Sequence, residues 1–290
     1  MNEKIFGALF GVAVGDALGA PLEFMSEGQI KSKHGLVTEM IGGGWLNLSP
    51  GEITDDTQMT IAVAKGILED PANPIPYVGR EFIKWHDGNP KDIGNCCRAV
   101  ISRAKSNGEK WEDAAVFVHE TTGGKTAGNG ALMRTMFPIL YYGNESKRMT
   151  DEIGRMTHLH KHSRVCLAAY HDIIRHILNG GSKEGISQYI IGLPPSDLKP
   201  DGYAPNSIKI AVKAVLDCSS YEDTLVSVVN MGGDSDTNGA IAGGIAGALY
   251  GVKAIPSRWV EALDGEIRRT LTRLADTVYD AVSERGLLNG

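Results

Sequence analysis

Two short acidic segments, far apart in the sequence, share one composition. Residues 54–57 read TDDT, and residues 232–237 read GGDSDT. Like charges packed this closely repel, so the pKa of one carboxyl in each pair rises unless a cation lies between them. Four carboxylates with threonine hydroxyls form an all-oxygen ligand set, which suits Mg²⁺ or Mn²⁺ rather than zinc. If the fold brings both segments together, they can hold two ions a few ångströms apart.

The two acidic segments also have a purely structural interpretation. Each comes just before a helical pattern, where short oxygen-bearing side chains serve as N-caps and carboxylates are favoured by the helix dipole. For one such segment considered alone, helix capping explains the composition as well as a metal site does. The repetition of the composition favours the metal site.

Three alternate histidines, His158, His160 and His162, form a rival candidate metal site. Their spacing resembles the paired histidines of zinc amidohydrolases, which end an early strand of a barrel. Here they fall late in the chain, between two helical patterns, which disfavours zinc. We expect His160 and His162 to be solvated.

A glycine-rich stretch, AGNGALMR at residues 127–134, is a third chemical candidate. Small residues just before the start of a helix let backbone N–H groups approach a phosphate. The stretch is neither a Walker loop nor a GxGxxG after a strand. We expect a turn that contacts phosphate and leads into a helix.

Helical periodicity covers nearly the whole chain and predicts an all-α fold. Apolar residues after Thr54 recur at the i, i+3, i+4, i+7 positions of a half-buried helix, and similar stretches begin at Val165 and Ile208. A stretch from Trp259 to Val278 predicts one terminal helix. Because no linker or tandem repeat interrupts the pattern, we expect one domain over residues 1–290.

Two glycine ladders have a four-residue period. They consist of Gly7, Gly11, Gly15 and Gly19, and of Gly239, Gly243, Gly247 and Gly251. On a helix this spacing lines glycines along one face. Each glycine costs roughly 1 kcal/mol relative to alanine in a helix interior, so eight of them require a reason such as close backbone approach. We predict two tightly packed helices, in contact with each other.

Composition excludes several classes of protein. The 290 residues carry a formal charge of -6 with no basic stripe, so nucleic-acid binding has no electrostatic support. The four cysteines form no CxxC pair, and a reducing cytoplasm fits them best. The N-terminus lacks the positive region of a signal peptide, and the longest weakly polar run, residues 239–252, is too short to span a bilayer.

Five stretches resemble the ADP-ribosylglycohydrolases and appear in the order found in that family. Within the family, the chain is most similar to the dinitrogenase reductase-activating glycohydrolases of the arginine-directed bacterial branch. The five stretches are GALFGVAVGDALGAPLEF from Gly7, GGGWLNLSPGEITDDTQM from Gly42, AGNGALMR from Ala127, THLHKHS from Thr157 and GGDSDTNGAIAGGIAGALYG from Gly232. Residues 70–90, 100–125 and 180–225 are only loosely similar. The resemblance implies a single-domain, orthogonal multi-helix bundle with a dinuclear Mg²⁺ or Mn²⁺ cleft.

The resemblance also implies roles for individual residues. The implied metal ligands are Thr54, Asp55, Asp56, Asp92, Asp234, Asp236 and Thr237. Glu23 lies near the metals in the family, and it joins Asp55 and Asp56 as a candidate catalytic base. The implied contacts to ADP-ribose are Gly128, Asn129, Gly130 and His158, with Tyr203 against the guanidinium of a substrate arginine. Asp16 is expected to fix loop backbone.

The implied reaction is hydrolysis of the bond between ADP-ribose and a protein side chain, with arginine the preferred linkage. Serine-linked or O-acetyl-ADP-ribose hydrolysis on the same scaffold stays open, as does a catalytically inactive ADP-ribose-binding module. The acidic segments alone would also permit a dinuclear phosphohydrolase. The implied partners are an ADP-ribosylated protein, with dinitrogenase reductase a candidate, ADP-ribose as product, and a nitrogen-signalling regulator.

Overall fold

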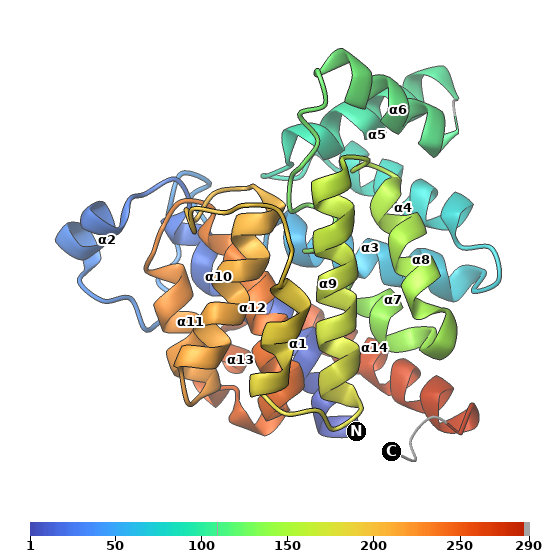
Figure 1. Ribbon diagram of the computed structural model, residues 1–290. Helices are drawn as coiled ribbons and strands as arrows, with labels where there is room; N and C mark the ends of the chain where they lie inside the picture. The colour runs from blue at the N-terminus through green and yellow to red at the C-terminus, as the bar shows by residue number, and fades with distance from the viewer. Residues whose placement is uncertain (109, 287–290) are drawn as a thin grey trace.

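Helices account for nearly all the regular structure of the chain. The computed structural model describes residues 1–108 and 110–286, and within them it contains helices and three isolated β-bridges but no β-strand. The expected all-α, multi-helix bundle is confirmed (Figure 1). The assignment of residues 1–290 to one domain stays a prediction, and it includes residues 109 and 287–290, which lie outside the described part.

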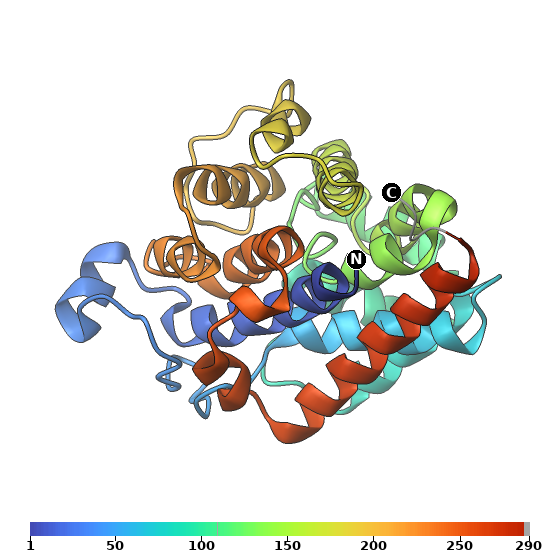
Figure 2. The same ribbon diagram turned by 90° about the horizontal axis from the view of Figure 1, so that it is seen from below.

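Two helices, α1 (Asn2–Gly19) and α12 (Ser235–Tyr250), form the centre of the molecule. Figure 2 shows them side by side, with other helices around them. Nearly every residue of both is buried, including the polar ones at the end that faces the acidic segments. Both are apolar on all sides, as a helix covered on every side must be.

The glycine ladders are the contact surface of α1 and α12. A Cβ atom on Gly11 would overlap the carbonyl oxygen of Gly243, and one on Gly15 would overlap that of Gly239. From Gly11 to Gly15 the contact on α12 moves back from Gly243 to Gly239, so the two helices run antiparallel. The predicted helix contact is therefore confirmed. Gly251 plays a different part, because it ends α12 with a φ of 81°.

The other helices cover this central pair. On α12 lie α10 (Ala204–Asp217) and α11 (Tyr221–Val229); on α1 lie α3 (Asp55–Glu69), α7 (Met136–Tyr141) and α14 (Gly265–Glu284). Helix α4 (Ile75–Asp87) packs on α3, and α8 (Ser146–Arg155) packs on α9 (Lys161–Leu178), which contacts α10 and α12. The remaining α-helices are α2 (Glu27–His34), α5 (Asn95–Asn107), α6 (Trp111–Thr121) and α13 (Ser257–Ala262). Short 3₁₀ helices are η1 (Ala20–Leu22), η2 (Gly143–Glu145), η3 (Glu184–Ile190) and η4 (Val252–Ala254).

Apolar side chains gather in one large cluster and one small one. The large cluster contains residues from Ile5 to Val282. The small cluster lies between α5 and α6 and includes Val100 and Val118. These two helices form a hairpin that stands out from the rest of the molecule in Figure 1.

Two details of the helix pattern differ from expectation. The single terminal helix predicted from Trp259 to Val278 is wrong, because α13 ends at Ala262 and α14 begins at Gly265. The break has a local cause: the side chain of Asp264 accepts hydrogen bonds from the backbone N–H groups of two residues in the first turn of α14.

Val165 lies on α9 but is 44% exposed, so it does not belong to the buried face of that helix.

The N-terminal helix is longer and more apolar than the run singled out in the sequence. Residues Asn2–Leu22 are long and apolar enough to cross a membrane by length and composition, with a mean hydropathy of 1.7. Within the fold, however, 94% of this stretch is buried, which is typical of a core helix. Unlike residues 239–252, this N-terminal stretch contains charged residues, among them Asp16, and it was not singled out from the sequence.

Gly11→Ala tests the backbone contact between the two central helices. Its methyl carbon would overlap the Gly243 carbonyl oxygen, so α1 and α12 must separate. We expect the free energy of unfolding to fall by about 3 kcal/mol or more, measured by urea denaturation with an unchanged slope. Gly28→Ala is the control, because a Cβ there meets nothing within 4 Å, and it should cause no loss. Equal stability of Gly11→Ala and the wild type would show that the backbones do not touch.

Candidate active site

Asp16, on α1, holds the start of α3 in place. Its buried carboxylate accepts hydrogen bonds from the backbone N–H groups of Thr54 (3.0 Å) and Thr57 (3.1 Å) and from their hydroxyls (2.8 and 2.5 Å). Burial raises the pKa of Asp16 to about 6, although these hydrogen bonds act to lower it. Since four donors already occupy this carboxylate, Asp16 orients the first acidic segment, as expected.

The capping interpretation of the acidic segments is not supported. Thr54 and Asp234 do occupy the N-cap positions of α3 and α12, but neither side chain caps its helix. The Thr54 hydroxyl turns to Asp16, and Asp234 Oδ2 accepts a hydrogen bond of 2.6 Å from Asn129 Nδ2. Neither Thr54 nor Asp234 therefore caps its helix, although Asp55, Asp56 and Asp236 lie in the first helical turns, where the helix dipole favours a carboxylate.

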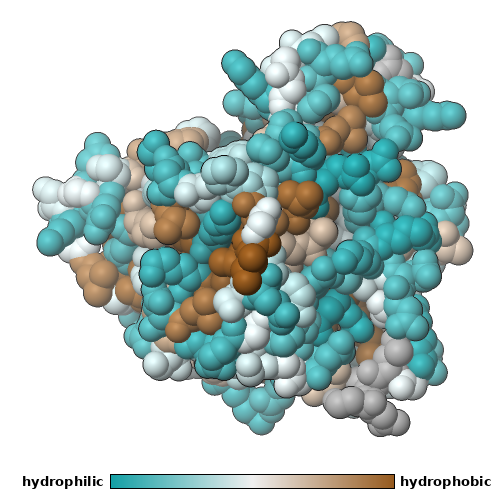
Figure 3. Space-filling model, viewed as in Figure 1, coloured by the Kyte–Doolittle hydropathy of each residue, from teal (hydrophilic) through white to brown (hydrophobic). Residues whose placement is uncertain are grey.

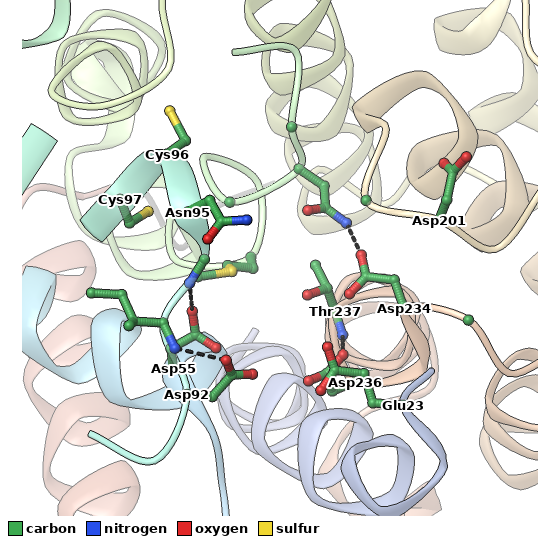
Figure 4. A pocket seen from close by; sticks show the side chains of 18 of the residues that line it. Glu23, Asp55, Asp92, Asn95, Cys96, Cys97, Asp201, Asp234, Asp236 and Thr237 are labelled. Atoms are coloured by element: carbon green, nitrogen blue, oxygen red, sulfur yellow. Dashed lines mark hydrogen bonds between the residues drawn. The ribbon is translucent and has the colours of Figure 1, made fainter. Parts of the chain in front are cut away.

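The two acidic segments meet in one place. The hydroxyls of Thr54 and Thr237 each lie 3.4 Å from Asp56 Oδ2, although Thr237 is 181 positions from Asp56 in the sequence. Carboxylate oxygens of Glu23, Asp234 and Asp236 all lie within 4.8 Å of one another. Figure 4 shows Asp55 and Asp92 on one side of the pocket, and Asp234, Asp236 and Glu23 on the other.

Crowding and burial make these carboxyl groups hard to ionise. Burial and the charge of Asp92 raise the pKa of Asp55 to about 7. Burial, with Asp92 and Asp234, raises the pKa of Glu23 to about 8, against a hydrogen bond from Trp45. The pKa values of Asp56 and Asp236 are raised well above the usual range by burial and by neighbouring carboxylates. Each ionised carboxylate therefore needs a positive partner here.

Divalent cations fit this donor set. Asp56 Oδ1 is fully buried and has no hydrogen-bond partner, which is costly for a carboxylate oxygen. The residues of α3 and α12 that line the pocket are Asp55, Asp236 and Thr237. Their side chains offer carboxylate and hydroxyl oxygens, the ligands that Mg²⁺ and Mn²⁺ prefer. Asp92 adds a carboxylate from the loop before α5, where its Oδ1 also accepts the N–H of Ile93 at 2.7 Å.

An acidic group made up of Glu23, Asp55, Asp92, Asp234 and Asp236 lines part of a cleft of about 590 Å³. The cleft is also lined by Gly128, Asn129, Gly130 and His158. Burial and the nearby Arg134 lower the pKa of His158 to about 3, so its ring is neutral at physiological pH. A Cβ on Gly130 would lie 2.9 Å from the ring of His158, and one on Gly128 would lie 3.2 Å from it. The two glycines therefore leave room for this histidine.

Arg134 holds this side of the cleft together, a role that the sequence did not reveal. Its buried guanidinium donates to the Thr157 hydroxyl (2.8 Å) and to the carbonyls of Ile153, Gly154 and Gly130. The Thr157 hydroxyl lies 2.7 Å from His158 Nδ1 and so orients that ring. As expected, residues 127–134 lead into a helix, because α7 begins at Met136 after Thr135 at its N-cap.

Three other predicted residues lie apart from the acidic group. Tyr203 is not among the described residues that line the cleft; its hydroxyl lies 2.7 Å from His162 Nδ1. His160 Nδ1 accepts the N–H of His162 at the start of α9. Both histidines are half-buried, so they are less solvated than expected. Within the described chain, no group of three histidines lies close enough to share an ion, which disfavours the zinc alternative.

Two aromatic residues at the rim were missed as functional candidates. The indole N–H of Trp45 donates to Glu23 Oε2 at 2.5 Å, and the ring of Phe24 lies 5.3 Å from that of Trp45. Both line the cleft, as do Arg98 and Asp201. The sequence did contain a signal for these residues, because Trp45 follows three glycines and Phe24 follows the candidate base Glu23. Whether a side chain is exposed at a cleft, however, cannot be inferred from its residue type.

Comparisons with known proteins agree with this geometry. The model of the ADP-ribosylglycohydrolase family matches residues 1–287. The ADP-ribosyl-[dinitrogen reductase] glycohydrolase of Rhodospirillum rubrum is 31% identical over 295 residues, covering 96% of each chain. The ADP-ribosylarginine hydrolase Tri1 of Serratia proteamaculans is 28% identical, covering 96% of this chain and 79% of its own. A solved structure titled "ADP-ribosylglycohydrolase-related protein complex" superposes with a TM-score of 0.83 at 29% identity, covering 97% of this chain and 98% of the other. The chain therefore belongs to the ADP-ribosylglycohydrolase family.

Proposed function

We propose that this chain is a divalent-cation-dependent hydrolase that removes ADP-ribose from arginine side chains of ADP-ribosylated proteins. The observation that carries the proposal is the meeting of two distant acidic segments in one cleft, where Thr237 of the second segment contacts Asp56 of the first. The Rhodospirillum relative is named for dinitrogen reductase and the Serratia relative for ADP-ribosylarginine. These names support arginine as the linkage and dinitrogenase reductase as a candidate target. A nitrogen-signalling regulator stays a prediction.

The proposed cation ligands are Thr54, Asp55, Asp56, Asp234, Asp236 and Thr237, together with Asp92. The buried, unpartnered Oδ1 of Asp56 supports the proposal, as do the carboxylates of Asp55, Asp92, Asp234 and Asp236 that line the cleft. Bound Mg²⁺ or Mn²⁺ would fix ribose hydroxyls and make water a stronger nucleophile. The neutral carboxyl groups of the metal-free protein would lose their protons as the cations bind.

The protein's own side chains supply the remaining steps. Asp55, Asp56 and Glu23 are the proposed acceptors of the proton from the attacking water. Carboxylates close to the anomeric carbon would stabilise the positive charge that develops on the sugar as its bond to nitrogen breaks. The same negative surroundings attract the guanidinium of the arginine. Gly128, Asn129, Gly130 and neutral His158 are the proposed contacts to the rest of ADP-ribose.

The proposed activity is tested by release of ADP-ribose from an arginine-linked ADP-ribosylated protein, with and without EDTA. We expect hydrolysis that EDTA abolishes and added Mg²⁺ or Mn²⁺ restores. Asp56→Asn should lower kcat/KM by more than about a hundredfold, because it removes a cation ligand. Asp113→Asn, in the exposed first turn of α6, should leave the rate unchanged.

Parallel substrates separate the alternatives. Faster release from a serine-linked protein or from O-acetyl-ADP-ribose would contradict the arginine assignment. Release of phosphate from simple esters alone would indicate a phosphohydrolase. Tight binding of ADP-ribose without turnover would indicate a binding module.

The raised pKa values predict how the metal-free protein responds to pH. Asp16, Asp55 and Glu23, with pKa values of about 6, 7 and 8, hold protons in the folded state that they release when unfolded. Folding stability therefore falls as pH rises through this range. With EDTA, we expect the free energy of unfolding to fall by more than about 2 kcal/mol between about pH 5 and about pH 9. Saturating Mg²⁺ should remove most of this fall, and a fall of equal size with and without the cation would contradict the metal site.

A further inference from the structure

Two large aromatic side chains are exposed at the rim of the cleft. Phe24 is 70% exposed and Trp45 is 54% exposed, and their rings contact each other at a tilt of 48°. Single exposed apolar residues are common on proteins, but a contacting aromatic pair at a candidate active site is characteristic of a binding surface. The ADP-ribose contacts proposed above leave this pair unused.

The ring of Trp45 and the backbone of Phe24 are held in place. Trp45 is fixed by its hydrogen bond to Glu23, and the preceding Gly44 packs so closely on Pro21 that a Cβ would lie 2.9 Å from it. Phe24 has a φ of 63°, which bulky residues rarely adopt. A hydrogen bond of 2.7 Å from its N–H to the Gly233 carbonyl stabilises that backbone. An unfavourable backbone conformation at an exposed phenylalanine points to a function for the ring.

An open groove begins at this pair and runs along α2. Glu23, Phe24 and Trp45 line both the cleft and the groove, so the two are continuous. The groove is further lined by Pro21, Met25, Gly28, Gln29, Ser32 and Lys33. Its lining combines apolar side chains, such as Phe24, Met25 and Trp45, with polar side chains from α2. Such a mixture suits a polypeptide, which has both apolar side chains and backbone polar groups to satisfy.

We propose that the Phe24–Trp45 pair and the groove along α2 bind the polypeptide on either side of the ADP-ribosylated arginine. The proposal rests on the proposed function and names the part of the substrate that this surface recognises. Its consequence is a preference for ADP-ribosylated protein over free ADP-ribosyl-arginine.

The layout of the cleft assigns this surface to the protein part of the substrate. The reacting carbon must lie at the acidic group, with the rest of ADP-ribose toward Gly130 and His158. The arginine must then leave the acidic group by another path. The path past Glu23 leads to the aromatic pair, where a guanidinium and its flanking residues can lie against the rings.

Two substitutions test the proposal from opposite directions. Phe24→Asn removes the ring but keeps a residue that tolerates a positive φ. Gly28→Tyr adds a side chain to the groove, at a position where a Cβ meets nothing within 4 Å. For each, kcat/KM is measured with an arginine-linked ADP-ribosylated protein and with ADP-ribosyl-arginine. We expect the ratio of the two values to fall about tenfold, chiefly through a higher KM for the protein.

Matched controls lie away from the groove. Asp113→Asn changes an exposed side chain in the first turn of α6. Figure 3 shows that apolar residues also gather elsewhere on the surface, near the middle of that view. As a control for lost apolar surface, Ile191→Ser removes a side chain that is 79% exposed, in the segment after η3. Both should keep the ratio within about twofold of the wild type. An unchanged ratio in Phe24→Asn and Gly28→Tyr, or equal losses on both substrates, would overturn the proposal. A wild type that hydrolyses neither substrate would instead overturn the proposed function, and this inference with it.

Discussion

Direct backbone contact between α1 and α12 determines where the acidic side chains lie. The contact continues to the last residue of α1, since a Cβ on Gly19 would overlap the carbonyl oxygen of Ser235. The hydroxyl of Ser235 donates back to the Gly19 carbonyl at 2.8 Å. With the helix backbones this close, the start of α12 has one position relative to Asp16 on α1. Asp16 in turn holds the start of α3, so both acidic segments are placed by a single helix pair.

This arrangement keeps together groups that repel one another. Buried carboxylates with raised pKa values oppose folding when they ionise, and the unpartnered Asp56 Oδ1 adds to that cost. The large apolar core and the close helix contact must offset it. Cations that bind only the folded state would then stabilise the protein by mass action. A rigid core around a strained polar centre is what a site that preorganises its ligands requires.

Much of this architecture could be predicted from the sequence. The glycine period indicated a close helix pair because glycine in a helix interior has a cost that packing must explain, and the two TDDT-like segments indicated a shared site because their composition repeats. Other features depend on three-dimensional context. Arg134 looked like the end of a glycine-rich motif, yet it is the buried link between that loop and His158. Periodicity placed Val165 in the core, but a helix face that is half covered leaves such residues exposed.

The rim of the cleft was the least predictable part. Tyr203, predicted to face the substrate arginine, is not among the described residues that line the cleft, and its hydroxyl lies 2.7 Å from His162 Nδ1, while Phe24 and Trp45 line the cleft. Loop side chains such as these are directed by backbone conformation and by neighbours distant in sequence, here Gly233 and Glu23. Residue spacing carries little information on loop backbone conformation or on which distant residues become neighbours.

Titration of the metal-free protein with Mn²⁺, followed by electron paramagnetic resonance, tests the central claim most directly. If both acidic segments share one site, the chain should bind two ions whose spins couple, because they lie a few ångströms apart. Binding of a single uncoupled ion, or of none below millimolar Mn²⁺, would contradict the account.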